Sequence, residues 1–161
     1  MKLNIKKLSE KAVMPVKAHN TDAGFDLTAT SITTEINECG QLIIVYHSGI
    51  AVDIPEGYVG LLFSRSSIAK KSIIQTNCVG VIDAGYHGEV MAKFKTTTDV
   101  VPAVYKEGDK FAQLVIVPLA QIDLEEVDEL PDSERNDGGY GSSDKVSNVE
   151  APAETTTEEQ K

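Results

Sequence analysis

Asp83 lies in the segment Gly80–Val90, whose residue types suit proton transfer beside a ring-shaped ligand. Val81 and Ile82 are typical of the end of a buried strand, and the glycine-rich residues that follow are typical of a turn. Asp83 is therefore expected where a hairpin bends, with Tyr86 at the same opening. A carboxylate fixed on strands beside a flat aromatic ring suits a general base. Taken alone, the segment also fits a turn that merely closes a hairpin.

Arg65, Ser66 and Ser67 place a guanidinium and two hydroxyls at the entry to a short helix, which we expect over residues 67–72 with Ser66 or Ser67 as its N-cap. Backbone N–H groups at a helix start form a ready site for anions. Simple capping would also explain the serines. The neighbouring arginine favours a phosphate.

Asp22 and Asp26 are two carboxylates four residues apart, and in a strand they would point to the same face. One of them is a candidate for holding water around a magnesium ion, although surface turn chemistry would also explain the pair. Gln113 interrupts an otherwise apolar strand. A buried glutamine must find polar partners, so it either bonds to local backbone or faces a ligand site.

The segment 135–143, RNDGGYGSS, has the composition of an arm that wraps a ligand. Gly139 and Gly141 let the backbone pass close to a bound molecule. Arg135 can grip a terminal phosphate in a fork, and Tyr140 can stack on a base. Glycine-rich segments near a terminus are usually linkers, but linkers seldom combine an arginine, a ring and three glycines.

Composition bounds the class of protein. The chain has 161 residues and a net charge of −10, which argues against general binding to nucleic acid or anionic membranes. No apolar run approaches the roughly 18–20 residues of a membrane span, and no signal-peptide pattern opens the chain.

Three scattered histidines lack zinc-ligand spacing. Cys39 and Cys78 form no disulfide framework and are expected to be reduced core or strand residues. Tryptophan is absent, so the core is expected to rest on Val, Ile and Leu.

Short β-branched runs separated by turn signals predict an all-β fold, a jelly-roll-like barrel or sandwich with one short helix. The expected strands are 3–8, 25–29, 42–46, 49–54, 58–63, 81–82, 90–95 and 111–117. From about residue 125 the composition becomes acidic. We therefore divide the chain into a core over 1–124, a linker and arm over 125–144, and an acidic tail over 145–161, which is expected to be disordered.

Together, and in this order, five segments resemble the motifs of the trimeric all-β dUTPase (dUTP diphosphatase) family. They are AHNTDAGFDLTA, SRSSIAKK, NCVGVIDAGYHGEV, GDKFAQLV and RNDGGYGSS, and they span residues 18–143. Each segment alone is a weak signal, but five in order at family-like separations are specific.

The resemblance implies a distorted β-barrel that hydrolyses dUTP to dUMP and pyrophosphate with the help of Mg²⁺. Asp83 resembles the general base that activates the water attacking the α-phosphorus. Tyr86 resembles the residue that packs under the deoxyribose and leaves no room for a 2′-hydroxyl. Such an enzyme limits uracil incorporation into DNA and supplies dUMP for dTMP synthesis.

The resemblance also implies how the rest of the nucleotide is held. The hairpin would surround the uracil, too narrowly for the methyl group of thymine, through Asn77, Gly80, Val81, Ile82 and Met91. The phosphates would be held by Arg65, Ser66, Ser67 and Gln113, with Asp26 on magnesium-bound water. The arm, through Arg135, Gly139, Tyr140 and Gly141, would close over the γ-phosphate and the uracil of a neighbouring subunit in a homotrimer.

Several positions depart from the common family pattern. Tyr140 stands where phenylalanine is most frequent, Ser67 replaces a frequent glycine, and His87 replaces a common arginine or glutamine. Asn136 and Asp137 replace the usual Gly-Glu of the arm.

Three rival interpretations remain. A dCTP deaminase shares the fold, but it needs a glutamate about ten residues after the hairpin aspartate, and Lys93 occupies that position. A regulatory protein on the same scaffold could bind a protein partner through the acidic tail. A jelly-roll module without chemistry would leave Asp83, Arg65, Gln113 and the arm as independent accidents. For the enzyme we expect a cytoplasmic location, or the host cytoplasm if the source is viral.

Overall fold

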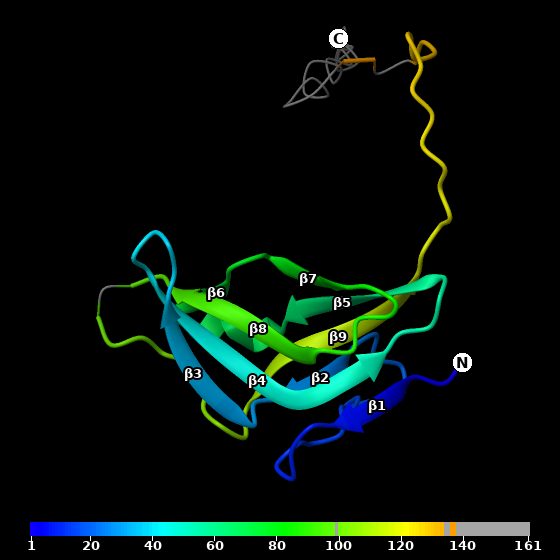
Figure 1. Cartoon of the computed structure of the whole chain (residues 1–161). Coiled ribbons are helices and arrows are strands. Elements are labelled where there is room, and N and C mark those ends of the chain that lie inside the picture. Colours follow the sequence, from blue (N-terminus) through cyan, green and yellow to red (C-terminus); the bar gives the residue numbers. More distant parts are fainter. Residues whose placement is uncertain (99, 134–135, 138–161) are drawn as a thin grey trace, which may run out of the picture. The chain divides into compact units, whose positions relative to one another are not determined.

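The computed structural model describes residues 1–98, 100–133 and 136–137, which form nine strands and one 3₁₀ helix. The chain divides into two units, Met1–Ile122 and Asp123–Lys161, and each is described by itself. All the strands belong to the first unit (Figure 1). The elements are β1 (Asn4–Lys7), β2 (Phe25–Thr28), β3 (Ser31–Ile36), β4 (Leu42–Asp53), β5 (Tyr58–Ser64), η1 (Ser66–Lys70), β6 (Ile73–Gln75), β7 (Val79–Ile82), β8 (Glu89–Thr96) and β9 (Lys110–Pro118).

Two antiparallel sheets form the first unit. One has the strand order β1-β4-β8-β6, with β3 also paired to β4, and the other has the order β2-β9-β5-β7. In Figure 1 the long strand β4 runs along the first sheet, while β5 and β9 lie in the second. The predicted all-β, jelly-roll-like fold is confirmed.

The centre of the core is aromatic. Tyr46 and Phe111 are fully buried and stack with ring centroids 5.4 Å apart, and Phe94 meets Tyr46 edge-on at 5.2 Å. Tyr46 also donates a hydrogen bond to the Tyr105 carbonyl and accepts one from the Tyr105 N–H. The expectation of a core built on Val, Ile and Leu is therefore incomplete, because four aromatic residues, Tyr46, Phe94, Tyr105 and Phe111, gather at its middle.

β4 is one strand of twelve residues, where the sequence predicts two. The predicted break falls at residues 47–48, directly before Gly49, which has a positive φ of 68°. Around it the register between β4 and β8 shifts between His47 and Ala51. A bulge of this kind bends a strand without ending it. The prediction also misses β3 and β6, which are short or largely exposed on one face.

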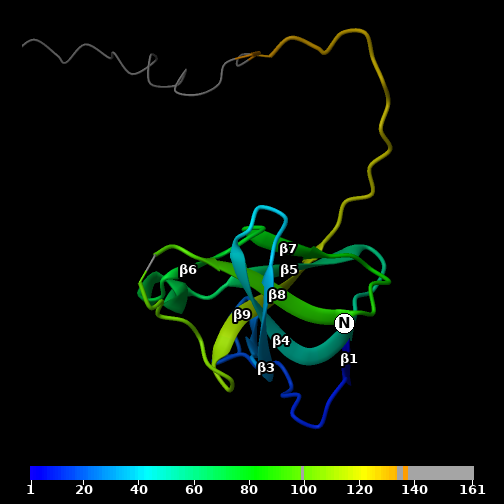
Figure 2. The same cartoon turned by 60° about the vertical axis from the view of Figure 1, so that its left-hand side comes forward.

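β7 and β8 do not pair with each other, so the predicted hairpin is wrong as a two-stranded ladder. β7 pairs with β5, whereas β8 pairs with β4 and β6. Figure 1 and Figure 2 both show the two strands running in different layers. The connection from Asp83 to Gly88 therefore crosses from one sheet to the other.

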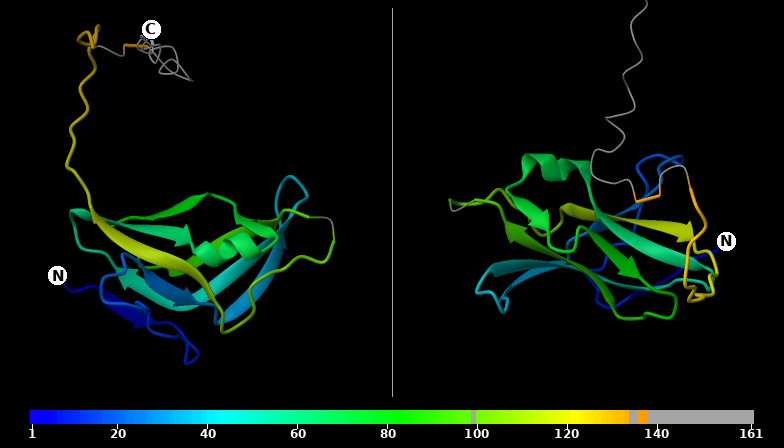
Figure 3. Two further views of the ribbon diagram at one scale, coloured as in Figure 1. Left: turned by 180° about the vertical axis from the view of Figure 1, so that it is seen from behind. Right: turned by 90° about the horizontal axis from the view of Figure 1, so that it is seen from above.

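The predicted short helix is a single 3₁₀ segment, η1, which directly follows β5 (Figure 3). Its N-cap is Arg65, and no side chain caps it, so the prediction of a serine N-cap is wrong. The two cysteines also differ from expectation. Cys39 and Cys78 are exposed in turns rather than in the core or in strands, and Cys78 has a positive φ of 58°.

Candidate active site

A cavity of about 390 Å³ opens between β7 and β8, because the two strands diverge into different sheets. Its lining includes all six residues that the sequence predicts around the base and sugar. These are Asn77, Gly80, Val81, Ile82, Tyr86 and Met91. Three of them, Val81, Tyr86 and Met91, keep exposed fractions of 64%, 46% and 38%. The cavity thus presents apolar surface that a flat ring can cover.

Asp83 begins the turn beside this cavity. The Tyr86 N–H donates to the Asp83 carbonyl over 3.2 Å, and Gly85 takes a positive φ of 84°, which glycine adopts without strain. The Asp83 side chain is exposed, and its carboxylate has no hydrogen-bond partner among the described residues. Its oxygens are therefore open to solvent at the edge of the cavity.

Tyr86 is held in place by its own turn. Its hydroxyl donates to the Glu89 carbonyl over 3.3 Å, and its ring lies so close over Gly88 that a Cβ there would overlap the hydroxyl and the ring. Gly88 is thus required by a close approach. His87, which stands where the family commonly has arginine or glutamine, has a partner outside the cavity. Its Nε2 lies 3.1 Å from Asp53 Oδ1.

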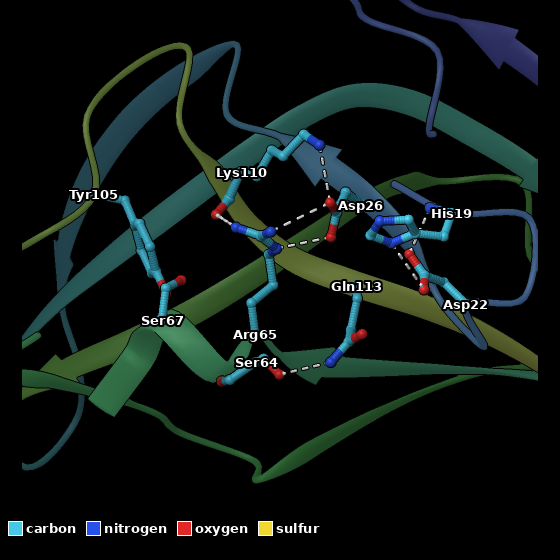
Figure 4. Close-up of polar contacts among 9 residues, drawn as sticks. All are labelled: His19, Asp22, Asp26, Ser64, Arg65, Ser67, Tyr105, Lys110 and Gln113. Atoms are coloured by element: carbon cyan, nitrogen blue, oxygen red, sulfur yellow. Dashed lines mark hydrogen bonds and ion pairs between the residues drawn. The ribbon is translucent and has the colours of Figure 1, made fainter. Parts of the chain in front are cut away.

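A second cavity, of about 290 Å³, lies where β2, β9 and the end of β5 meet. Asp22, Asp26, Arg65, Ser66 and Gln113 line it, together with Ala18, Ala23 and Gly24. It shares no lining residue with the first cavity. Figure 4 shows four of these side chains, Asp22, Asp26, Arg65 and Gln113, which come from segments far apart in the sequence.

An ion-pair cluster occupies one wall of the second cavity (Figure 4). Arg65 donates from Nε to Asp26 Oδ1 over 2.7 Å and from Nη2 to Oδ2 over 3.3 Å, and Lys110 Nζ reaches Oδ2 at 3.0 Å. Sequence reasoning missed Lys110. It follows the Gly-Asp turn at the start of β9, and the pairing of β2 with β9 places it across from Thr28, near Asp26. Two cations against one carboxylate give this three-residue cluster a net positive charge, while Asp22 adds a further carboxylate to the cavity lining.

Gln113 satisfies both of the alternatives that its sequence context left open. Its Nε2 donates to the Ser64 carbonyl over 3.2 Å, while the side chain also lines the second cavity. Its Oε1 lies close to Gly24, where a Cβ would be only 2.8 Å away. The amide oxygen is thus held at the cavity wall by packing.

The two serines of the predicted phosphate segment separate. Ser66 lines the second cavity, whereas Ser67 Oγ lies 3.0 Å from the Tyr105 hydroxyl. A single 3₁₀ segment also offers few aligned peptide dipoles, so the helix-start argument for an anion site is weak here. Arg65 and Ser66 are the residues of this segment that line the cavity.

Asp22 is fixed at the rim of the second cavity. The His19 N–H donates to Asp22 Oδ2 over 2.8 Å, and this bond lowers the pKa of the Asp22 carboxyl below its ordinary 3.8. The His19 ring lies 3.5 Å from the other oxygen. Asp22 is therefore ionised at neutral pH, and its carboxylate accepts the hydrogen bond from the His19 N–H.

Gln75 is a buried polar residue that sequence reasoning did not single out. Its side chain is bonded on every side to Ser64, Leu62 and Asn77, all from elements that border the two cavities. The signal for it was weak, because β6 has only three residues and Gln75 ends it.

The sequence profile of the family described as dUTPase matches residues 10–144 of the chain. A deoxyuridine 5'-triphosphate nucleotidohydrolase of Corynebacterium glutamicum is 39% identical over 145 residues, which cover 89% of this chain and 95% of the relative. One of Hydrogenobaculum sp. is 35% identical over 143 residues, covering 88% and 97%. The chain belongs to the dUTPase family. Its predicted family membership is thereby confirmed, and its curated relatives are named as hydrolases of a nucleoside triphosphate.

Solved dUTPase structures share the fold. A mutant dUTPase of Staphylococcus bacteriophage 80alpha, determined with dUpNHpp, superimposes with a TM-score of 0.74 at 34% identity and covers 88% of this chain and 98% of its own. A mutant dUTPase from phage phi11 of S. aureus has a TM-score of 0.68 at 34% identity, with 82% and 100% covered. Its structure is described as revealing the coordination of a structural Mg(II) ion.

Part of the segment that resembles the dUTPase arm lies outside the described residues. Arg135, Gly139, Tyr140 and Gly141 lie outside the described residues. Asn136 is described and has a positive φ of 40°, a conformation that the glycine usual in the family adopts freely. It is held by reciprocal hydrogen bonds with Ser133 of 2.8 and 2.9 Å.

Within the described ranges, no group of three or more His, Cys, Asp or Glu side chains is arranged to hold a metal ion. The second cavity nevertheless suits a magnesium ion that keeps its waters. A carboxylate has about four acceptor positions, and Asp26 uses three of them, so one remains for a water molecule. Gln113 Oε1 is a second acceptor at the wall. No helix in the described part of the chain has the length and apolar character needed to cross a membrane.

Proposed function

We propose that this chain hydrolyses dUTP to dUMP and pyrophosphate, with Asp83 as the general base that activates the attacking water. The observation that carries the proposal is the cavity between β7 and β8, lined by apolar and amide groups, with an exposed carboxylate in the adjoining turn. With the uracil ring in the cavity, a water molecule beside Asp83 would lie at the edge of the site that binds the ring. In the cell such an activity would limit uracil in DNA and supply dUMP.

The larger cavity is assigned to the nucleoside. Backbone and amide groups near Asn77 and Gly80 would contact the edge of the uracil, and the exposed side chains of Val81 and Met91 would pack on its surroundings. Tyr86 would lie under the deoxyribose, because its ring is fixed by the contact with Gly88. A 2′-hydroxyl would then meet the ring, which favours dUTP over UTP.

The smaller cavity is assigned to the phosphates. Arg65, Ser66 and Gln113 supply donors and polar groups there, and Lys110 adds a second positive charge on the Asp26 cluster. Phosphoryl transfer asks mainly for positioning and charge neutralisation. Magnesium would supply the remaining neutralisation across the triphosphate. We assign the ion chiefly to the phosphates, with Asp26 and Gln113 holding its waters, since Mg²⁺ commonly keeps several waters in such sites.

We infer a homotrimer in which neighbouring copies complete one site. The two cavities share no lining residue, and the first exposes apolar side chains that a second copy would help to cover. Co-expression of Asp83→Asn with Arg65→Ala tests this arrangement. If the two cavities of one site come from different copies, some mixed sites carry neither change and activity returns. If they come from one copy, every site is defective and the mixture stays inactive.

The arm is proposed to complete the site. Arg135 would hold the γ-phosphate, and Tyr140, between Gly139 and Gly141, would cover the uracil. A segment that closes over bound nucleotide excludes water and positions the phosphates. Removal of residues 135–161 is therefore expected to reduce turnover of dUTP while leaving the barrel folded.

The deciding experiment is pyrophosphate release from dUTP, dCTP, dTTP and UTP in the presence of magnesium. We expect rapid turnover of dUTP alone, and a loss of about 10²–10⁴-fold in the Asp83→Asn variant, the contribution typical of a general base. Glu56→Gln is the matched control, because Glu56 is also an exposed carboxylate in a turn between strands. Absence of dUTP turnover by intact, folded protein would refute the proposal.

A regulatory role is the second candidate. The dUTPase of Staphylococcus bacteriophage 80alpha, which is 34% identical with a TM-score of 0.72, is described among phage dUTPases that control transfer of virulence genes. A protein partner bound through the acidic residues 145–161 would be the corresponding feature of this chain. Deletion of those residues would then abolish capture of the partner and spare hydrolysis.

A further inference from the structure

The orientation of the Gln75 amide is fixed by its neighbours. The side chain is buried, with an exposed fraction of 3%. Its Nε2 donates to the Leu62 carbonyl over 3.1 Å and to Asn77 Oδ1 over 3.0 Å, and its Oε1 accepts from Ser64 Oγ at 3.0 Å. A backbone carbonyl can only accept. The nitrogen of Gln75 must therefore face Leu62, and its second N–H is directed to Asn77.

This contact in turn orients Asn77. Its carboxamide oxygen accepts from Gln75, so its Nδ2 lies on the other side of the group. Nδ2 is near Gly80, only 3.6 Å from where a Cβ on that glycine would be, and both residues line the larger cavity. Asn77 thus presents a hydrogen-bond donor to this cavity and keeps its acceptor turned away.

We propose that Gln75 is a positioning residue that sets base selection by fixing the Asn77 amide as a donor, an inference that rests on the proposed function. Uracil presents the same O4 acceptor as thymine at the edge where cytosine presents an N4 amino donor. In the proposed arrangement the Asn77 donor meets this edge, where it matches uracil and leaves cytosine with two opposed donors. A buried or partly desolvated mismatch of this kind gives strong discrimination.

Gln75 also reaches the second cavity from behind. Ser64, whose hydroxyl it holds, accepts the Gln113 amide through its carbonyl over 3.2 Å. The same buried amide thus supports groups at both cavities. Its primary effect remains on Asn77, because that bond alone decides which atom of an exposed side chain is presented.

The test compares kcat/KM for dUTP and dCTP in wild type and two variants. Gln75→Met keeps an unbranched side chain of similar length but removes the donor, so Asn77 can rotate and offer its oxygen to cytosine. We expect the dUTP-to-dCTP ratio to fall at least about 10-fold, mainly through a rise for dCTP. Thr30→Val is the matched control, since it removes another buried side-chain hydrogen bond, from Thr30 Oγ1 to the His47 carbonyl over 3.0 Å, outside both cavities. It should lower Tm without changing the ratio.

Asn77→Asp is the second variant and does not depend on a change in the core, because Asn77 is exposed. It keeps an acceptor for Gln75 and presents oxygen instead of nitrogen to the cavity, so the ratio should also fall at least about 10-fold. A folded Gln75→Met protein with an unchanged ratio would overturn the inference. If Gln75→Met does not fold, an unchanged ratio in Asn77→Asp overturns it and a reduced ratio supports it. Wild-type protein that does not turn over dUTP refutes the proposed function itself, a result distinct from both.

Discussion

Replacement of Gly24 by alanine is expected to disable the second cavity while leaving the chain folded. A Cβ at Gly24 would lie 2.8 Å from Gln113 Oε1 and 3.2 Å from Gln113 Cβ, whereas ordinary contacts begin at 3.4 Å. The amide oxygen must therefore move by the difference, about 0.6 Å. Because Gln113 Nε2 is already 3.2 Å from the Ser64 carbonyl, a shift of this size breaks that bond.

The expected cost in stability is small. Loss of one hydrogen bond costs about 0.5–1.5 kcal/mol, and the reduced backbone freedom of alanine returns about 0.4–1 kcal/mol, since the φ of Gly24 is not in the left-handed region. The net change in the free energy of unfolding should stay within about 1 kcal/mol. Misplacement of Gln113, which is proposed to position the phosphates, should nevertheless reduce kcat/KM by about 10²-fold.

The assay is pyrophosphate release from dUTP by Gly24→Ala, Gln113→Ala and the double variant, with urea unfolding of each. Gln113→Ala removes the atoms that the new methyl group would strike. Gly24→Ala should therefore reduce kcat/KM about 10–100-fold in the parent and little further in the double variant. Wild-type activity in Gly24→Ala, or equal losses in both backgrounds, would refute the reasoning.

Three further predictions concern the polar cluster, the sugar contact and the core. Asp26→Asn leaves two cationic neighbours without their carboxylate, so urea unfolding should show a loss of about 1–3 kcal/mol. Gly88→Ala should displace the Tyr86 ring, and competition assays with dUTP and UTP should show a preference reduced about 10-fold. Burial raises the pKa of Tyr46 above its ordinary 10.0, so its contribution to stability is complete below pH 10 and is lost as pH rises above it. Urea midpoints measured between pH 8 and 11 should show this decline, and Tyr46→Phe should abolish it.

Sequence reasoning located the features that depend on residues close together in the chain. The turn around Asp83 needs only a buried run followed by glycines, and the resulting contact of Tyr86 with its own turn spans three residues. The residues that line the larger cavity were named through the resemblance to the dUTPase family, whose motif matches one continuous segment of the chain.

The features that sequence reasoning missed depend on pairing between distant strands. Lys110 reaches Asp26 across 84 residues, and Gln75 meets Leu62 through the approach of β6 to β5. The divergence of β7 and β8 has the same origin, since each strand finds a better partner elsewhere in the chain than in its neighbour. No local pattern specifies such contacts.

The pairing of β2 with β9 has a consequence for how the protein is made. The second sheet, β2-β9-β5-β7, cannot be completed while β9 is still absent, because β9 separates β2 from the β5–β7 pair. Synthesis at roughly 5–20 residues per second leaves the apolar face of β5 waiting for several seconds on the ribosome. The cavity that unites Asp26, Arg65 and Gln113 is therefore assembled only after Pro118 has emerged, so a nascent chain shortened before β9 contains the segment proposed to bind the base but lacks the cavity proposed for the phosphates.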